Sequence, residues 1–146
     1  MNKEAFSAYN THQRGDEDVR ETEARALLSC ANRLEAARQQ DCSKEFFADA
    51  LHHNQQLWTL FQACLCDPDN QLPRDLKVLL LNISAYVDKT TFRALGTRDK
   101  ALLGGLVSIN RNIANGLRKK TEETASSAMM TSQPDTMQGR PLVTSA

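Results

Sequence analysis

Residues 51–61 read LHHNQQLWTLF, and this stretch decides how the chain folds. On a helix, which turns by about 100° per residue, Trp58 and Phe61 fall on the same apolar side. His52 points away from that side and His53 lies at its edge, so the two histidines do not face a common ligand. The stretch therefore predicts the inward face of a helix, and neither a catalytic site nor a metal site.

The same apolar face extends over a predicted helix of residues 44–65. Its arc is about 140° wide, which suits a helix that packs against two neighbours. Asn54 lies near the middle of the arc, where an amide without a hydrogen-bonding partner would cost about 1–3 kcal/mol. We therefore expect Asn54 to be a buried polar residue with a partner. The expected core aromatic residues of this helix are Phe47, Trp58 and Phe61.

A second asparagine, Asn110, is placed in the same way on a helix predicted over residues 99–117. It lies in the middle of an apolar arc that includes Leu106 and Ile113. Two asparagines centred on two apolar faces suggest that Asn54 and Asn110 meet and fix the helix register. The alternative is that each amide bonds a nearby backbone carbonyl or a water molecule.

Two further helices are predicted over residues 18–40 and 73–95, each with apolar residues at every third or fourth position. Ser43 suits the start of a helix, Pro73 suits a first helical turn, and Gly96 suits a C-terminal cap. The fold class expected is all-α, a small bundle of about four helices. The expected organisation is a flexible segment 1–16, a helical domain 17–118 and a disordered polar tail 119–146.

The predicted helix over residues 73–95 is apolar on two opposite sides. Such a helix either lies at the centre of the bundle or presents one side to a partner. The main stripe consists of Leu76, Leu79, Leu80, Ile83, Tyr86, Val87 and Ala94. The second stripe, which is the expected partner-binding surface, consists of Val78, Leu81, Ala85 and Phe92.

The composition favours a small helical binding module. Among its 146 residues the chain has 18 Lys and Arg against 18 Asp and Glu, and this zero net charge argues against a dedicated nucleic-acid binder. The four cysteines match no zinc or redox spacing, and there is no phosphate-binding loop or nucleophile elbow. The start of the sequence has no apolar core typical of a signal peptide, and no apolar run approaches the length of a membrane span, so we expect neither. We expect a cytoplasmic protein that is not an enzyme, with no catalytic residue, cofactor, metal or membrane insertion.

Six short stretches occur in order along residues 5–118: AY at 8–9, RETEARALL at 20–28, ALHHNQQLW at 50–58, NQLP at 70–73, LLLNISAYV at 79–87 and INRNIANGL at 109–117. Taken together, they resemble the FlaF family, regulators of flagellar biosynthesis in alphaproteobacteria. The resemblance implies a non-enzymatic role in making flagellin. FlaF-like proteins promote flagellin production, opposite a regulator named FlbT that restrains flagellin translation.

The resemblance also implies partners. The expected direct partner is flagellin, bound as a cytosolic secretion chaperone would bind it, and the further expected partners are a FlbT-type regulator and the export apparatus. The alternative function is control of flagellin mRNA translation, through RNA or through an RNA-binding partner such as FlbT. A neutral chain with few aromatic residues favours the first function, because single-stranded RNA is bound by basic grooves and stacking rings. A third alternative is thiol- or metal-based sensing through Cys64 and Cys66.

Overall fold

The computed structural model describes the backbone of residues 2–130 and the side chains of residues 18–120. This part of the chain forms four helices and no strand, which confirms the predicted all-α fold. The helices are α1 (Asn2–Gln39), α2 (Lys44–Cys66), α3 (Arg74–Thr97) and α4 (Ala101–Met130).

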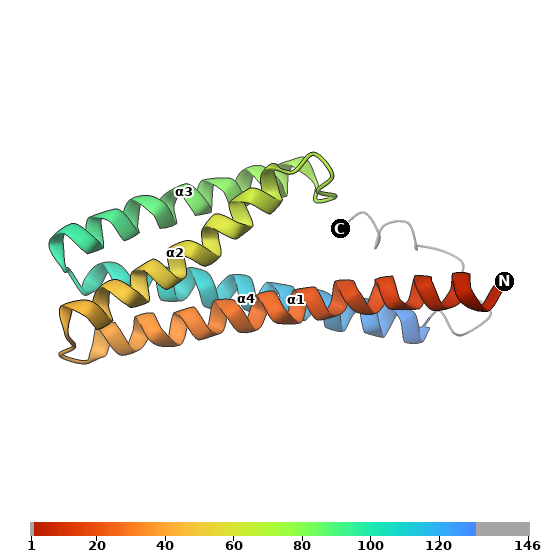
Figure 1. The fold of residues 1–146 in the computed structure, drawn as a ribbon, viewed down its shortest axis with the longest axis horizontal. Coiled ribbons are helices and arrows are strands. Elements are labelled where there is room, and N and C mark those ends of the chain that lie inside the picture. The colour runs from red at the N-terminus through yellow and green to blue at the C-terminus, as the bar shows by residue number, and fades with distance from the viewer. Residues whose placement is uncertain (1, 131–146) are drawn as a thin grey trace.

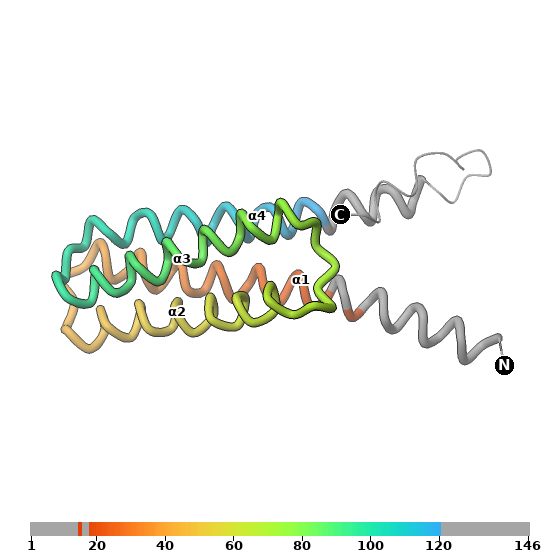
Figure 2. The backbone as a smooth tube through the Cα atoms, turned by 90° about the horizontal axis from the view of Figure 1, so that it is seen from above, coloured from red at the N-terminus to blue at the C-terminus, as the bar shows by residue number. Residues whose placement is uncertain are grey.

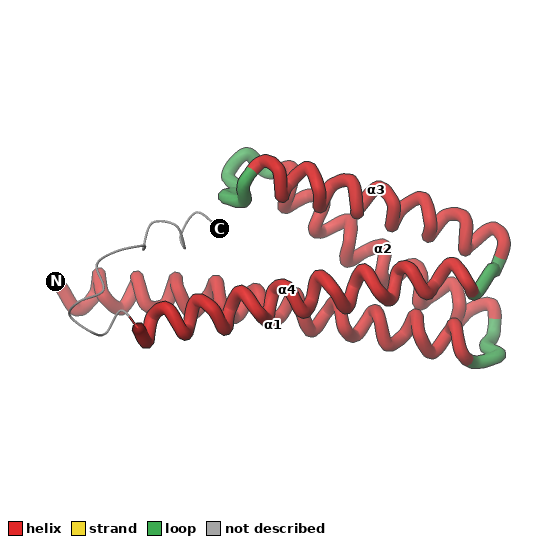
Figure 3. The backbone as a smooth tube through the Cα atoms, turned by 180° about the vertical axis from the view of Figure 1, so that it is seen from behind, coloured by secondary structure: helices red, strands yellow, loops and turns green. Residues whose placement is uncertain are grey.

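The helices form an antiparallel bundle in which α1 lies beside α2 and α4, and α3 completes the ring between α2 and α4 (Figures 1 and 2). The closest packing is between α1 and α4, and the loosest of these four neighbouring pairs is α3 and α4. The hairpin of α2 and α3 leans away from the α1–α4 pair toward the loop 67–73 (Figure 1). The two other loops lie together at the opposite end of the bundle (Figure 3).

The hydrophobic core forms mainly where α1, α2 and α4 meet. Leu27 and Leu34 of α1 are fully buried, and burial of one such side chain contributes about 1.5–3 kcal/mol. From α3, Val87 and Ala94 belong to this buried core, and the partly buried Ile83 and Leu95 pack against it. The buried core residues are Ala24, Leu27, Ala31, Leu34, Ala37, Phe47, Ala50, Leu51, Trp58, Val87, Ala94, Leu103, Leu106, Val107 and Ala114.

The α1–α2 loop and the α3–α4 loop, which lie together at one end of the bundle, use two different helix caps. The Ser43 hydroxyl accepts a hydrogen bond from the first turn of α2 at 3.1 Å, as expected for an N-cap. At the other loop the prediction is corrected, because α3 continues past Gly96 and Arg98 takes the left-handed conformation at φ 56°. The Arg98 N–H donates to the Ala94 carbonyl at 2.8 Å, and its guanidinium lies 5.9 Å from the Phe47 ring centroid. This cation–π contact offsets part of the strain of a non-glycine residue in that conformation.

The first and fourth helices are longer than their apolar patterns predict. α1 begins at Asn2 and not near residue 18, while α4 continues to Met130 and does not end near residue 117. The extension of α4 is rich in strong helix formers such as Ala, Glu and Lys, and it contains neither Gly nor Pro. Helical backbone can therefore continue after the apolar period has ended, which corrects the predicted helix ends.

The predicted domain boundaries fall inside these two helices. Helical backbone extends into residues 1–16, expected to be flexible, and into residues 119–146, expected to be a disordered tail. Residues 1 and 131–146 lie outside the part of the chain that the structure describes. The buried core lies within residues 17–118, the predicted helical domain.

Candidate functional site

The side of α3 that faces the bundle carries small and polar side chains. The Thr91 hydroxyl donates to the Val87 carbonyl of its own helix at 2.6 Å, so it is satisfied without a partner helix. Small side chains bury little apolar area, so hydrophobic burial holds α3 less strongly than it holds α1. The buried residues of α3 are Ser84, Val87, Thr90, Thr91 and Ala94.

The opposite side of α3 carries large apolar side chains that face solvent. Phe92 is 80% exposed and Val78 is 49% exposed, while Ala85 is exposed and Leu81 is half-buried. An exposed apolar side chain removes little area from water, so it adds little to the stability of the chain that carries it. These four residues, which are the predicted partner-binding residues, are named the α3 outer face from here on.

Two α3 residues assigned to the inward stripe are also half exposed: Leu79 at 54% and Tyr86 at 49%. This corrects the prediction for both. The spacing of apolar residues gives the stripe, but only α2 and α4 flank α3, so the edges of the stripe stay uncovered. Tyr86 reaches the backbone of α4 at Gly105, where an added Cβ would lie 3.0 Å from the tyrosine oxygen. α3 is therefore a flanking helix and not the centre of the bundle.

Asn54 and Asn110 meet in the core. The Asn110 Nδ2 donates to Asn54 Oδ1 at 2.7 Å and to the Leu27 carbonyl oxygen at 3.2 Å. The Asn110 Oδ1 accepts from Trp58 Nε1 at 3.0 Å. Both asparagines are fully buried, and Trp58 is 1% exposed. These four residues form a polar network that joins α1, α2 and α4.

The indole N–H fixes the orientation of both amides. Because Trp58 Nε1 can only donate, Asn110 must turn its oxygen toward the indole and its nitrogen toward Asn54. Asn54 must then present its oxygen, and this leaves its Nδ2 without a partner among the described residues. A buried N–H without a partner costs about 1–3 kcal/mol, so the network specifies helix register more than it adds stability.

The other residues singled out in the sequence divide between core and surface. Phe47 is buried and Phe61 is half-buried, with its ring edge-on to Trp58 at a centroid distance of 5.4 Å. His52 and His53 are both exposed. All four cysteines are free thiols, and in the described part of the chain no group of His, Cys, Asp and Glu is arranged to hold a metal ion.

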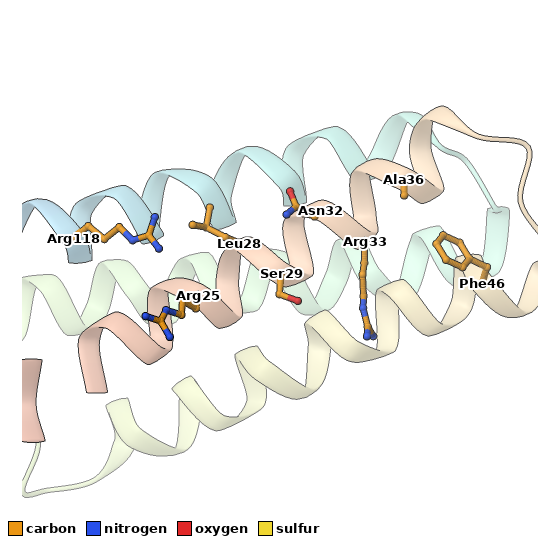
Figure 4. A pocket seen from close by; sticks show the side chains of 8 residues that line it. All are labelled: Arg25, Leu28, Ser29, Asn32, Arg33, Ala36, Phe46 and Arg118. Atoms are coloured by element: carbon orange, nitrogen blue, oxygen red, sulfur yellow. The ribbon is translucent and has the colours of Figure 1, made fainter. Parts of the chain in front are cut away.

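One feature that the sequence did not predict is a shallow groove of 490 Å³ along α1, lined by three arginines (Figure 4). Arg25 and Arg33 come from α1 and Arg118 comes from α4. The Glu21 carboxylate accepts from Arg118 at 3.0 Å and from Arg25 at 3.3 Å, and these contacts, with Arg118 the stronger, lower the pKa of Glu21. The one feature of the sequence that could have indicated this groove is the spacing of Arg25 and Arg33, which lie about two turns apart on a helix.

A second feature that the sequence did not predict is an apolar cleft of 130 Å³ between the α2–α3 hairpin and the α1–α4 pair. Its lining comes from all four helices and from the loop 67–73, for example Glu23, Phe61, Leu72 and Leu80. No local pattern joins these residues, because only the leaning of the hairpin brings them around one space.

The comparisons with known proteins agree with the family resemblance. Residues 5–117 match the family model described as flagellar protein FlaF, and they include the polar network and the α3 outer face. No curated protein and no solved structure matches the chain. Within the described residues, no helix is long and apolar enough to cross a membrane. Because the match covers most of its length, the chain belongs to the FlaF family of flagellar proteins.

Proposed function

We propose that the protein binds unpolymerised flagellin as a chaperone and thereby promotes flagellin synthesis and export. Membership of the FlaF family places the protein in flagellum biogenesis. The observation that carries the finer proposal is the α3 outer face, where Phe92 is 80% exposed although small side chains fill the buried side of the same helix. Exposed apolar side chains gathered on one helix face are typical of a protein–protein contact.

The spacing of the α3 outer face suits a helical partner. Val78, Leu81, Ala85 and Phe92 recur at intervals of three, four and seven residues, which keeps them on one side of α3. From Val78 to Phe92 the stripe is about 21 Å long at 1.5 Å per residue, enough for about four turns of a partner helix. An amphipathic helix of flagellin would place its own apolar residues against this stripe.

Binding of this kind gives the chaperone role a physical basis. An unpolymerised subunit exposes apolar helix surface that associates with any matching surface, including a second subunit. Covering that surface would prevent premature assembly and keep the subunit available for export. The α3 outer face contributes little to the stability of its own chain, so a partner can cover it without disturbing the core.

The second candidate function, action on flagellin mRNA, is favoured by one feature: the groove that Arg25, Arg33 and Arg118 line. Arginine side chains bind phosphate well. However, Glu21 accepts hydrogen bonds from two of the three arginines, and among the described residues that line the groove Phe46 is the only one with an aromatic ring. Flagellin binding is therefore the function that the described geometry supports best.

Size-exclusion chromatography with purified flagellin, together with a gel-shift assay on flagellin leader RNA at physiological salt, separates the two candidates. The proposal predicts co-elution with flagellin and no RNA shift. An RNA shift without co-elution would contradict it and support direct RNA binding. If neither occurs, the assay is repeated with a FlbT-type regulator present, and an RNA shift that needs this regulator would support indirect action on the mRNA.

A further inference from the structure

The apolar cleft between the α2–α3 hairpin and the α1–α4 pair is separate from the α3 outer face. Its volume of 130 Å³ is close to that of a buried apolar cavity of about 150 Å³ that holds a benzene molecule. The cleft is thus large enough for one bulky side chain such as leucine or phenylalanine. Its main apolar walls are Phe61, Leu65, Leu72, Leu80, Ile113 and Leu117.

Hydrogen bonds fix the loop 67–73, which forms one wall of this cleft. The Asn70 side chain donates to the Cys64 carbonyl at 2.9 Å and accepts from the Leu72 N–H at 3.0 Å. The Lys77 ammonium donates to the Asn70 carbonyl at 2.6 Å, which ties the loop to the first turn of α3. Leu72 is therefore a fixed wall of the cleft, and a ligand does not have to order the loop first.

A carboxyl group lies in this apolar lining. Glu23 of α1 lines the cleft and is partly buried, and no hydrogen bond or salt bridge from another described residue reaches its carboxylate. Burial raises the pKa of Glu23, and this effect is larger than the opposing effect of the nearby Arg20. A partly buried carboxylate without a partner carries a cost that a cation bound beside it would remove.

We propose that the cleft binds one bulky apolar side chain of a partner helix and that Glu23 pairs with a lysine or arginine one turn from that side chain. The size and apolar lining of the cleft select the first group, and the Glu23 carboxylate, which has no hydrogen bond or salt bridge within the described residues, selects the second. The inference rests on the proposed function, since it gives the chemistry of the flagellin segment that would occupy this site. It adds a second point of attachment to the α3 outer face.

Trp58 makes the site measurable. It is the only tryptophan of the chain, it lines the cleft, and its ring stands edge-on to Phe61 of the same wall. The fluorescence of the full-length protein therefore reports occupancy of the cleft, provided that the probe contains no tryptophan.

The experiment titrates the full chain with two synthetic amphipathic helical peptides free of tryptophan. They share one face of leucine and alanine, and the residues that flank the leucines are lysine in one peptide and glutamate in the other. We expect a saturable change in Trp58 fluorescence with the lysine peptide and at least about tenfold weaker binding of the glutamate peptide. Equal binding of the two peptides, or no fluorescence change with either, would overturn the proposal.

Three variants, with a fourth in reserve, localise the effect. Ile113→Phe fills the cleft and should weaken lysine-peptide binding by at least about tenfold, whereas Leu60→Phe, at an exposed position outside the cleft, should leave it unchanged. If Ile113→Phe does not fold, Leu72→Phe fills the same space from the loop. Glu23→Gln should reduce the preference for the lysine peptide to less than about twofold. Unchanged binding and preference in folded variants would overturn the proposal.

A failure of the cleft to bind a peptide can be distinguished from a failure of the protein to bind flagellin. If the peptide titration fails while wild-type protein co-elutes with flagellin, the cleft is not a binding site and the chaperone proposal stands. If the titration succeeds without flagellin co-elution, the cleft binds a basic apolar helix from a different partner.

Discussion

α1 and α3 lie on opposite sides of the same small bundle, where α2 and α4 flank each of them, yet they distribute their large apolar side chains in opposite ways. On α1, Leu27 and Leu34 are fully buried. On α3, Val78 and Phe92 face solvent while small residues such as Ser84 face the bundle. Apolar side chains that remain largely exposed add little to the stability of their own chain. The large apolar side chains of α1 therefore stabilise the fold, whereas those on the α3 outer face remain available to the partner that we propose.

The largest expected change in the free energy of unfolding comes from truncating one buried leucine of α1. A truncation on α3 serves as the comparison. Leu34→Ala removes a fully buried side chain and should lower the free energy of unfolding by about 2–5 kcal/mol. Phe92→Ala removes a larger side chain that is 80% exposed, and it should change the free energy by no more than about 0.5 kcal/mol. Urea unfolding followed by circular dichroism measures both.

The comparison would fail if Phe92→Ala were as destabilising as Leu34→Ala. That result would mean that Phe92 packs into the fold in solution, and α3 would then resemble α1.

The second largest change in the free energy of unfolding is expected in the polar network, which joins α1, α2 and α4 but does not include α3. Asn110→Leu leaves both the Trp58 N–H and the Asn54 oxygen without a partner, so it should cost about 2–4 kcal/mol. Asn54→Leu removes the unpartnered Nδ2 but also the acceptor of one Asn110 N–H, so it should cost less than Asn110→Leu, about 1 kcal/mol. Equal costs for the two variants, measured by urea unfolding, would contradict the assigned orientation of the amides.

The smallest expected change in stability comes from replacing Glu23, and its sign follows from the direction of the pKa shift. Its pKa is higher in the folded chain than the usual 4.5, so the folded state favours its protonated form. Above the folded pKa, the ionised Glu23 therefore destabilises the folded chain. This destabilisation is relieved as the pH falls from the folded pKa toward 4.5. Glu23→Gln should raise stability by no more than about 1 kcal/mol near pH 7, and the gain should shrink near pH 4.

Thermal melts at both pH values check this prediction. The pKa of Glu21 shifts in the opposite direction, because Arg118 and Arg25 donate hydrogen bonds to its carboxylate. Glu21→Gln should therefore lower stability near neutral pH, and it serves as the matched control. A destabilising effect of Glu23→Gln at pH 7 would show that Glu23 has a partner in the fold.

The helices, the buried asparagines and the apolar stripes of α3 could be predicted from the sequence because each rests on local periodicity. The sequence leaves two alternatives for Asn54 and Asn110, a contact with each other or a local partner for each. The structure shows the contact, with Asn110 Nδ2 at 2.7 Å from Asn54 Oδ1. The exposure of Leu79 and Tyr86 could not be predicted, since spacing shows that a helix has an apolar stripe but not how many neighbours cover it.

Features that depend on helix ends and on long-range packing were missed for physical reasons. The last turn of α3 passes Gly96, and the left-handed residue is instead Arg98, whose guanidinium contacts Phe47 of α2, far away in the sequence. The cleft exists only because the α2–α3 hairpin leans away from the other pair, and its walls come from segments far apart in the sequence. Neither feature leaves a signature in any one stretch.

The central claim, that α3 carries the surface for flagellin, is tested most directly by the affinity of a double variant. Val78→Asp with Phe92→Asp places two charges on the α3 outer face, and Val19→Asp with Leu60→Asp places two charges at comparably exposed apolar positions of α1 and α2. Isothermal titration with flagellin should show at least about a hundredfold loss of affinity for the α3 variant only. Melting temperatures should stay close to that of the wild type. An α3 variant that remains folded and binds flagellin as tightly as the control variant would contradict the claim.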